Sequence, residues 1–93
     1  MEMEQIAGKM RERLSGSGFT GSVKFDCGDA GVVLIDGESV STQNAAADCT
    51  VSLAKDDLEA IVAGELDPTA AFMQGKVRAH GDLSLAMRLN ALL

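Results

Sequence analysis

The sequence predicts an α+β fold with a mainly antiparallel sheet. The spacing of its apolar residues changes from a helical to a strand period near Gly21 and changes back after Leu53, and residues 83–93 are almost wholly apolar. Read along the chain, these changes give a helix, three or four strands, two helices, a strand and a final helix. That order is typical of α+β domains.

Length and composition bound the protein before any motif is considered. With 93 residues, 1–93 is expected to form a single domain around one core. The net charge of −6 argues against nucleic acid, whose binding rests on cationic side chains, and allows at most transient membrane contact. Because neither a basic-then-apolar export signal nor a membrane-spanning apolar run is recognisable, a cytoplasmic protein is predicted.

Residues 1–14 predict an amphipathic helix that is followed by a Gly/Ser stretch over 15–18. Its apolar face is formed by Met3, Ile6, Ala7, Met10 and Leu14. A helix lying across a sheet is the expected role. A membrane-touching helix is the alternative, which the mixed charges of its polar face disfavour.

Strand patterns follow. Apolar and polar residues alternate over 23–27, and Val32–Ile35 returns after a glycine-rich turn as the second strand of a hairpin. Residues 39–46 are polar and predict either a short edge strand or a loop. Alternation resumes over 49–53, which predicts another strand with one buried face.

Two helices are predicted next. Residues 55–63 place their larger apolar side chains on one face, and Gly64 is a natural helix stop. Asp67 and Pro68 then mark a helix start, because Asp accepts a hydrogen bond from the free amides of the first turn and Pro fits that turn. This short helix is expected to run through Met73.

A strand over 76–80 and a helix over 83–93 complete the prediction. The strand directs Val77 and Ala79 inward, and Asp82 caps the helix. The helix is apolar around most of its axis and must be covered on most sides. It covers a cavity, binds a second subunit, or does both.

Residues that carry chemistry are sparse. Cys27 and Cys49 are interpreted as reduced core residues, with a disulfide or a reactive thiol as the alternatives. Two cysteines and the single His80 lack the close spacing of a zinc site, and neither a metal nor a cofactor is expected. Gly16–Gly21 matches G-x-G-x-x-G, but it follows a helix and precedes a strand, the reverse of a dinucleotide-binding loop.

Lys76, Arg78 and His80 form the one local concentration of positive charge. Alternation places all three on the outer face of their strand, where such residues are ordinarily solvated. The alternative is that they contact the carboxylate or phosphates of an amphipathic ligand near a cavity mouth.

The most distinctive segments are Ile35-Asp36-Gly37, 47–52 (ADCTVS), Asp57-Leu58, 64–76 (GELDPTAAFMQGK) and 81–89 (GDLSLAMRL). Together they resemble the sterol carrier protein type 2 family, and the short, acidic chain is similar to bacterial members. The resemblance implies a five-stranded, mainly antiparallel sheet covered on one side by about four helices, with an apolar tunnel between the layers. It also implies non-enzymatic binding and transfer of fatty acid, fatty acyl-CoA, phospholipid or sterol inside the cell.

Position in that layout predicts the lipid contacts. The helical wall of the cavity is expected at Phe72, Met73, Leu83, Met87 and Leu92. Further candidates, each of which could equally be ordinary core, are Leu58, Val62, Phe25 and Leu34. Because most bacteria make no sterol, a fatty acid, acyl-CoA or phospholipid is the expected ligand.

Two other function classes stay open. The chain could be an accessory or adaptor subunit that docks on an enzyme of lipid metabolism, or on itself, through its apolar last helix. It could also be an enzyme that acts on a bound acyl group with Cys49 or His80. The absence of a recognisable catalytic pattern favours the carrier.

Overall fold

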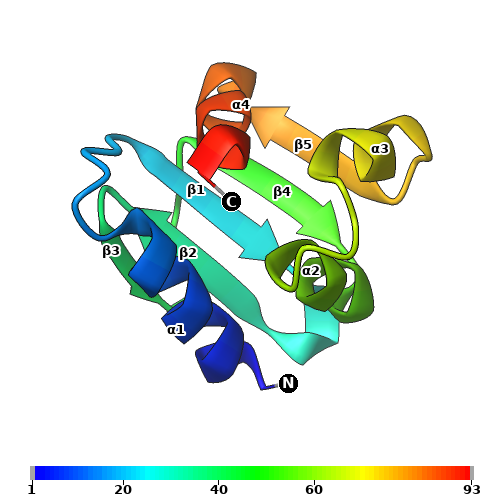
Figure 1. Cartoon of the computed structure of the whole chain (residues 1–93), viewed down its shortest axis with the longest axis horizontal. Helices are drawn as coiled ribbons and strands as arrows, with labels where there is room; N and C mark the ends of the chain where they lie inside the picture. The colour runs from blue at the N-terminus through cyan, green and yellow to red at the C-terminus, as the bar shows by residue number, and fades with distance from the viewer. Residues whose placement is uncertain (1, 93) are drawn as a thin grey trace.

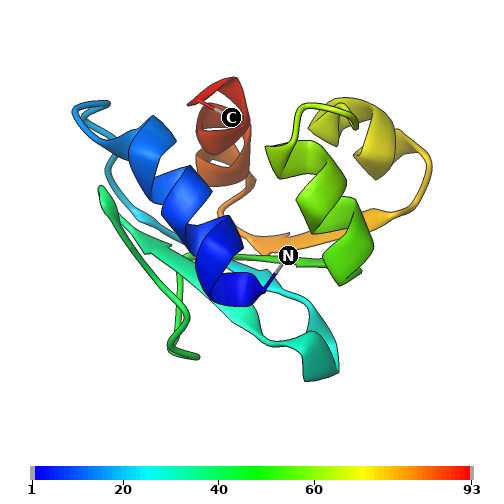
Figure 2. The same cartoon turned by 60° about the horizontal axis from the view of Figure 1, so that its bottom comes forward.

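The computed structural model describes residues 2–92 and contains a sheet with the α helices packed on one face (Figure 1). The elements in chain order are α1 (Met3–Leu14), β1 (Ser22–Asp26), a 3₁₀ turn η1 (Gly28–Ala30), β2 (Val32–Asp36), β3 (Ser39–Ser41), β4 (Cys49–Leu53), α2 (Lys55–Val62), α3 (Pro68–Met73), β5 (Val77–Gly81) and α4 (Leu83–Leu92). Viewed from the side, α1, α2, α3 and α4 all lie above the sheet (Figure 2). None of the helices within 2–92 is long and apolar enough to cross a membrane.

The sheet has five strands in the order β3-β2-β1-β4-β5. The pair β1–β4 is parallel, and every other neighbouring pair is antiparallel. The predicted α+β fold with a five-stranded, mainly antiparallel sheet is therefore confirmed. The segment 39–46, left open between strand and loop, contains both, because only Ser39–Ser41 pairs with β2.

Strand register determines which side chains lie beneath the helices. Phe25 of β1 pairs with Val51 of β4, which pairs in turn with Ala79 of β5. Paired residues share a face of the sheet, so these three form one row on the helical side. The opposite face carries the alternate residues, including Lys24, whose ammonium donates a hydrogen bond to Asn44 at 3.1 Å.

Helix α1 closes one half of the helical face. Its apolar stripe, formed by Ile6, Ala7, Met10 and Leu14, is completely removed from solvent. These side chains join one hydrophobic cluster with Val33 and Ile35 of β2 and Val40 of β3. The sequence spacing that predicts an amphipathic helix thus packs α1 across β2 and β3.

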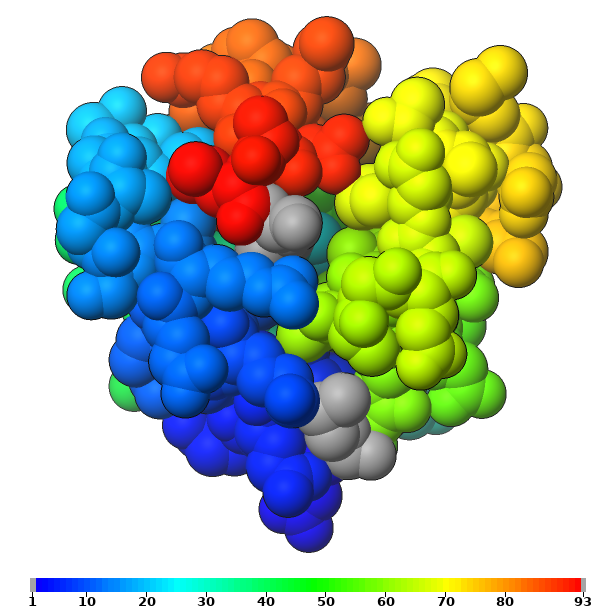
Figure 3. Space-filling view, viewed as in Figure 1, coloured from blue at the N-terminus to red at the C-terminus, as the bar shows by residue number. Residues whose placement is uncertain are grey.

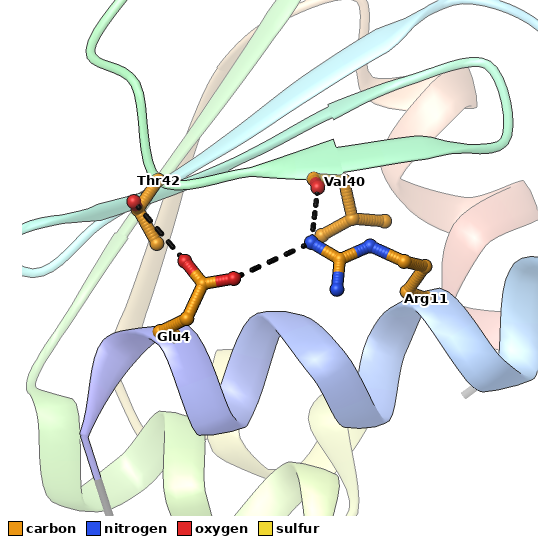
Figure 4. Close-up of polar contacts among 4 residues, drawn as sticks. All are labelled: Glu4, Arg11, Val40 and Thr42. Atoms are coloured by element: carbon orange, nitrogen blue, oxygen red, sulfur yellow. Dashed lines mark hydrogen bonds and ion pairs between the residues drawn. The ribbon is translucent and has the colours of Figure 1, made fainter.

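Polar contacts also hold α1 against the edge strand (Figure 4). The Arg11 guanidinium donates a hydrogen bond to the Val40 carbonyl at 2.6 Å and lies 3.5 Å from the Glu4 carboxylate. Glu4 accepts a longer hydrogen bond from the Thr42 hydroxyl at 3.4 Å. On the other side of α1, Arg13 donates to the Val62 carbonyl at the end of α2, at 2.6 Å.

Both predicted helix caps of the second half are present. The Asp67 carboxylate accepts a hydrogen bond from the Thr69 amide at 3.0 Å at the start of α3. The Asp82 carboxylate accepts one from the Ser84 amide at 3.1 Å and one from the Ser84 hydroxyl at 2.6 Å. Each carboxylate therefore satisfies an amide that the first helical turn leaves unpaired.

Gly81 fixes the position at which α4 leaves the sheet. It has φ +98°, and a Cβ at this position would overlap the Asp48 carbonyl oxygen. The same oxygen accepts a hydrogen bond from the Asp82 amide at 2.9 Å. Only glycine combines this backbone conformation with so close an approach.

Candidate functional site: an apolar cavity

A cavity of about 450 Å³ lies between the sheet and helices α2, α3 and α4. Its floor is formed by Phe25, Val51, Leu53, Val77 and Ala79. Its walls are formed by Ile61 of α2, by Pro68, Thr69 and Phe72 of α3, and by Leu83, Ala86, Met87, Leu89 and Asn90 of α4. In the space-filling view, a hollow separates α4, in orange and red, from the yellow atoms of α3 (Figure 3).

The cavity opens to solvent between α3 and α4. Phe72 is 56% exposed, Leu83 50% and Met87 74%, although all three line the cavity. Large apolar side chains gathered at the surface are unusual and make this opening a candidate binding site. The apolar composition of α4 predicts a helix that is covered on most sides. This prediction is wrong, because the side that carries Leu83 and Met87 faces the opening.

Two polar side chains interrupt the apolar lining. The Asn90 amide of α4 donates a hydrogen bond to the Thr69 hydroxyl of α3 at 3.2 Å, so the pair joins the two walls of the cavity. Among the described residues, the lining contains no charged side chain. The site therefore offers a mostly apolar interior with one hydrogen-bonding group at its edge.

Several of the predicted lipid contacts lie together in this cavity. Phe25 contributes to the floor, and Phe72, Leu83 and Met87 contribute to the helical walls. Contact of these residues with a lipid remains a prediction.

The structure places two other expected wall residues elsewhere. Met73 is 82% exposed and does not line the cavity, because neighbouring helical residues project about 100° apart and its neighbour Phe72 is directed inward. Leu92 is partly buried against the hydrophobic core and does not line the cavity. Neither residue therefore lies in the cavity wall where it was expected, and contact of either one with a lipid stays a prediction.

The additional candidates Leu58, Val62 and Leu34 also lie outside the cavity lining. Leu58 and Val62 are one helical turn apart on α2 and are buried in the core, whereas Ile61 is the α2 residue that lines the cavity. Leu34 pairs with Lys24 and Ser41 on the face of the sheet away from the helices, since Val33 and Ile35 occupy the helical face.

The expected head-group contacts are also displaced from the cavity. Arg78 pairs with Ser52 and His80 pairs with Thr50, and all four alternate with residues that face the helices. Lys76 precedes β5 and does not line the cavity. Arg78 and His80 are therefore on the outer face of β5, as alternation predicts, and none of the three cationic residues lines the cavity. Contact of these residues with a ligand head group stays a prediction.

Sequence reasoning missed part of the lining. The inward positions of β4 and β5 were visible as alternation, so Val51, Leu53, Val77 and Ala79 could have been assigned to the floor. No local signal marked the Asn90–Thr69 pair, since the two residues are 21 positions apart and meet only in the folded chain.

The thiols have the properties of structural cysteines. Both Cys27 and Cys49 are free, and Cys49 is fully buried. Burial raises the pKa of the Cys49 thiol, and the negative charge of Asp82 raises it further. Because the thiolate is the reactive form, a raised pKa disfavours a nucleophilic role. Within residues 2–92, no group of three His, Cys, Asp or Glu side chains is arranged to hold a metal ion.

The glycine-rich segment after α1 binds a side chain of the protein itself. The amides of Gly16 and Gly18 donate hydrogen bonds to the two carboxylate oxygens of Glu38, at 2.9 and 3.0 Å. These contacts tie the segment to the turn between β2 and β3. The resemblance to a phosphate-binding loop is therefore one of sequence alone.

Comparison with known proteins agrees with this architecture. Residues 2–93 match the model of the SCP-2 sterol transfer family. Sterol carrier protein 2 of Rattus norvegicus is 46% identical over 46 residues, which are 50% of this chain and 8% of that protein. The matched segment is thus a small part of a much longer relative.

Solved structures share the fold over nearly the whole chain. The solution structure of palmitated SCP2L2 from Aedes aegypti superposes with a TM-score of 0.80 and 25% identity, covering 99% of this chain and 94% of that one. The sec-alkylsulfatase Pisa1 from Pseudomonas sp. contains a similar region, with a TM-score of 0.62 and 23% identity over 94% of this chain and 14% of the enzyme.

Proposed function

The chain belongs to the SCP-2 sterol transfer family, and we propose that residues 1–93 act as one domain that holds the apolar part of a lipid in the cavity. The observation that carries the proposal is the cavity itself, about 450 Å³ of apolar space that opens between α3 and α4. Small-molecule sites span roughly 300–1,000 Å³. Each methylene moved from water into such a site contributes about 0.8 kcal/mol.

The proposed lipid contacts combine floor and wall residues. Phe25 supports the chain from below, and Phe72, Leu83 and Met87 cover it at the opening. Methionine suits this position because its side chain adapts to irregular partners. Phe72, Leu83 and Met87 are exposed at the opening, and a lipid that enters the cavity would cover them.

Relatives support an acyl chain or a sterol as the occupant. The Aedes relative of the same fold is palmitated, and the family is described by sterol transfer. Fatty acid, fatty acyl-CoA, phospholipid and sterol are therefore the proposed ligand classes, bound and transferred without chemical change. A cytoplasmic, bacterial carrier is part of the same proposal and rests on the sequence.

An accessory role within a larger assembly is the second candidate. It is favoured by relatives in which the matching region is a small part of a longer chain: the 46 matched residues are 8% of the rat protein, and the similar region is 14% of the alkylsulfatase. In this role the exposed apolar side of α4, which carries Leu83 and Met87, would dock on a partner enzyme. A protein that takes up no lipid and associates through this surface would favour this candidate over the carrier, and a lipid-free monomer would count against it.

The experiment compares Met87→Glu with Met73→Glu. Both methionines are highly exposed, so neither substitution should unfold the protein, but only Met87 lines the cavity. Native mass spectrometry of each freshly purified protein would detect co-purified lipid. Displacement of a fluorescent fatty acid by acyl-CoA, phospholipid and sterol would then rank the ligand classes.

Met87→Glu should weaken lipid binding at least about tenfold, because a carboxylate in an apolar cavity is poorly solvated. Met73→Glu should bind as the unmodified chain does. Equal binding by both variants would contradict the assignment of the cavity as the lipid site.

A further inference from the structure

We propose that the Asn90–Thr69 pair selects lipids whose polar end is uncharged and carries a hydroxyl group, such as a long-chain alcohol or a monoacylglycerol. This inference rests on the proposed lipid-binding function and deepens it. It concerns the only polar side chains among the described residues of the cavity lining.

The pair has hydrogen-bonding capacity to spare. Within residues 2–92, the one hydrogen bond of the Asn90 side chain runs from Nδ2 to the Thr69 hydroxyl oxygen. The amide retains a second N–H donor and a carbonyl acceptor, and the Thr69 hydroxyl retains its own proton. A ligand hydroxyl placed there can both donate to the Asn90 Oδ1 atom and accept from the pair.

A carboxylate finds no matching partner in the same place. The lining carries no cationic side chain among the residues that the structure describes. Arg78 and His80 lie across the sheet from the cavity, on the outer face of β5. An anion that entered would therefore lose hydration without gaining an opposite charge.

The charges beside the walls are negative at both helix starts. Asp67 caps α3 immediately before Pro68, and Asp82 caps α4 immediately before Leu83, so each cap adjoins a residue of the lining. Hydrogen bonds from Ser84 hold the pKa of the Asp82 carboxyl below its ordinary value, so this group is ionised at neutral pH. Arg88 of α4 offsets part of the Asp82 charge, so the Asp67 carboxylate, which binds the Thr69 amide, is the charge that disfavours a ligand carboxylate at the pair.

The arrangement also orients the ligand. Asn90 and Thr69 lie at the edge of the cavity, Thr69 exposed and Asn90 half-buried, while Phe25, Val51 and Leu53 form a buried floor. An amphipathic molecule satisfies both parts when its chain lies on the floor and its hydroxyl meets the pair. The hydrogen bond between α3 and α4 is then shared with the ligand, which becomes part of the link between the two walls.

Matched ligands of equal chain length test the inference. The probes are 1-dodecanol and 1-monododecanoylglycerol, which carry hydroxyl groups, and dodecanoate, which carries a charge. Dissociation constants are measured at neutral pH for the unmodified chain, for Asn90→Leu, for Thr69→Val, and for Asn44→Leu as a control. Asn44 is an amide on the opposite side of the sheet, where it binds Lys24.

The unmodified chain and Asn44→Leu should bind each hydroxyl ligand about tenfold more tightly than dodecanoate, which is the order of the net effect of one hydrogen bond. Asn90→Leu and Thr69→Val should bring that ratio close to unity. The side-chain amide resonances of Asn90 should shift with dodecanol and remain unchanged with dodecanoate.

Three other outcomes separate this inference from the function on which it rests. If all three probes bind with equal affinity, and Asn90→Leu leaves that equality unchanged, the head-group selection is overturned and the lipid cavity stands. If none of the probes binds or shifts the Met87 methyl resonance, the lipid cavity itself is overturned. Preference for a hydroxyl that survives both substitutions would assign the selection to other residues and overturn the role of the pair.

Discussion

One face of the sheet carries two halves with opposite properties. Over β2 and β3, α1 places a continuous apolar stripe in contact with the strands, and its four core residues are completely buried. Over β4 and β5, α3 and α4 leave a cavity of about 450 Å³, and large apolar side chains at its rim stay exposed. The two halves share one sheet and one hydrophobic cluster.

Helix length and anchoring explain the difference. The closing helix α1 has 12 residues and is held at both sides by Arg11 and Arg13, whereas α3 has only 6. Among residues 2–92, the α3 and α4 walls of the open half are joined by one side-chain hydrogen bond, between Asn90 and Thr69. The comparison teaches that the proposed binding site is the part of the helical face that the helices do not fill.

The largest expected effect is a difference in stability between two methionine substitutions, one in each half. Met10→Ala removes a fully buried side chain of α1 and should lower the free energy of unfolding by about 2–5 kcal/mol. Met87→Ala removes a side chain that is mostly exposed and should change stability by at most about 0.5 kcal/mol. Urea denaturation measures both.

For lipid affinity, the larger effect should come from Met87→Ala and the smaller effect from Met10→Ala. Met87→Ala is expected to weaken binding, because it removes part of the cavity wall, while folded Met10→Ala binds normally. A comparable loss of stability in both variants would remove the distinction between the halves.

Gly81→Ala should destabilise the chain by about 1–3 kcal/mol, because the new Cβ overlaps the Asp48 carbonyl and the backbone has a positive φ. Gly75→Ala is the control: it has a similar φ of +77° but no atom within 4 Å of the added Cβ. Hydrogen exchange should locate the extra loss of Gly81→Ala in α4. Equal losses in the two variants would mean that the close approach to Asp48 contributes nothing.

Arg11→Ala should lower the free energy of unfolding by about 1 kcal/mol, the net contribution of one hydrogen bond. It removes the contact with the Val40 carbonyl, so amides of β3 should exchange faster with solvent. Lys9→Ala, on the same helix, controls for the loss of a surface cation. Unchanged exchange in β3 would show that the packing of α1 alone holds the edge strand.

The smallest effect is a pH dependence at the start of α4. Hydrogen bonds from Ser84 lower the pKa of the Asp82 carboxyl in the folded state, so its stabilising contribution is present above the unfolded pKa of about 3.9. That contribution is lost as pH falls through the lower, folded pKa. Thermal unfolding of the unmodified chain and of Asp82→Asn should therefore differ most near neutral pH and converge in acid. A difference that persists undiminished in acid would assign it to something other than the charge.

The fold could be predicted from the sequence because its signals are local. Periods of apolar residues located the helices and strands, and Asp67, Pro68 and Asp82 marked two helix starts, because each of these signals acts within one turn of chain. The undecided segment 39–46 lacked a period, and its three paired residues are fixed by β2 instead.

The candidate site could be predicted from the sequence only in part, because it depends on how the helices and strands pack together. The apolar run Val32–Ile35 concealed its alternation, so Leu34 could not be assigned to the outer face. The sequence of α3 does not distinguish Phe72 from Met73, since the choice is made by the docking of that helix on β5. The Asn90–Thr69 contact joins two helices and has no local pattern.

The most direct test uses the native methionines as probes of both halves. In protein labelled with ¹³C at the methionine methyl groups, addition of dodecanol should shift the Met87 resonance and produce contacts between this methyl group and the chain of the ligand. Met10, buried under α1, should remain unchanged. A ligand that shifts Met10 and leaves Met87 unaffected would place the binding site in the closed half and contradict the account.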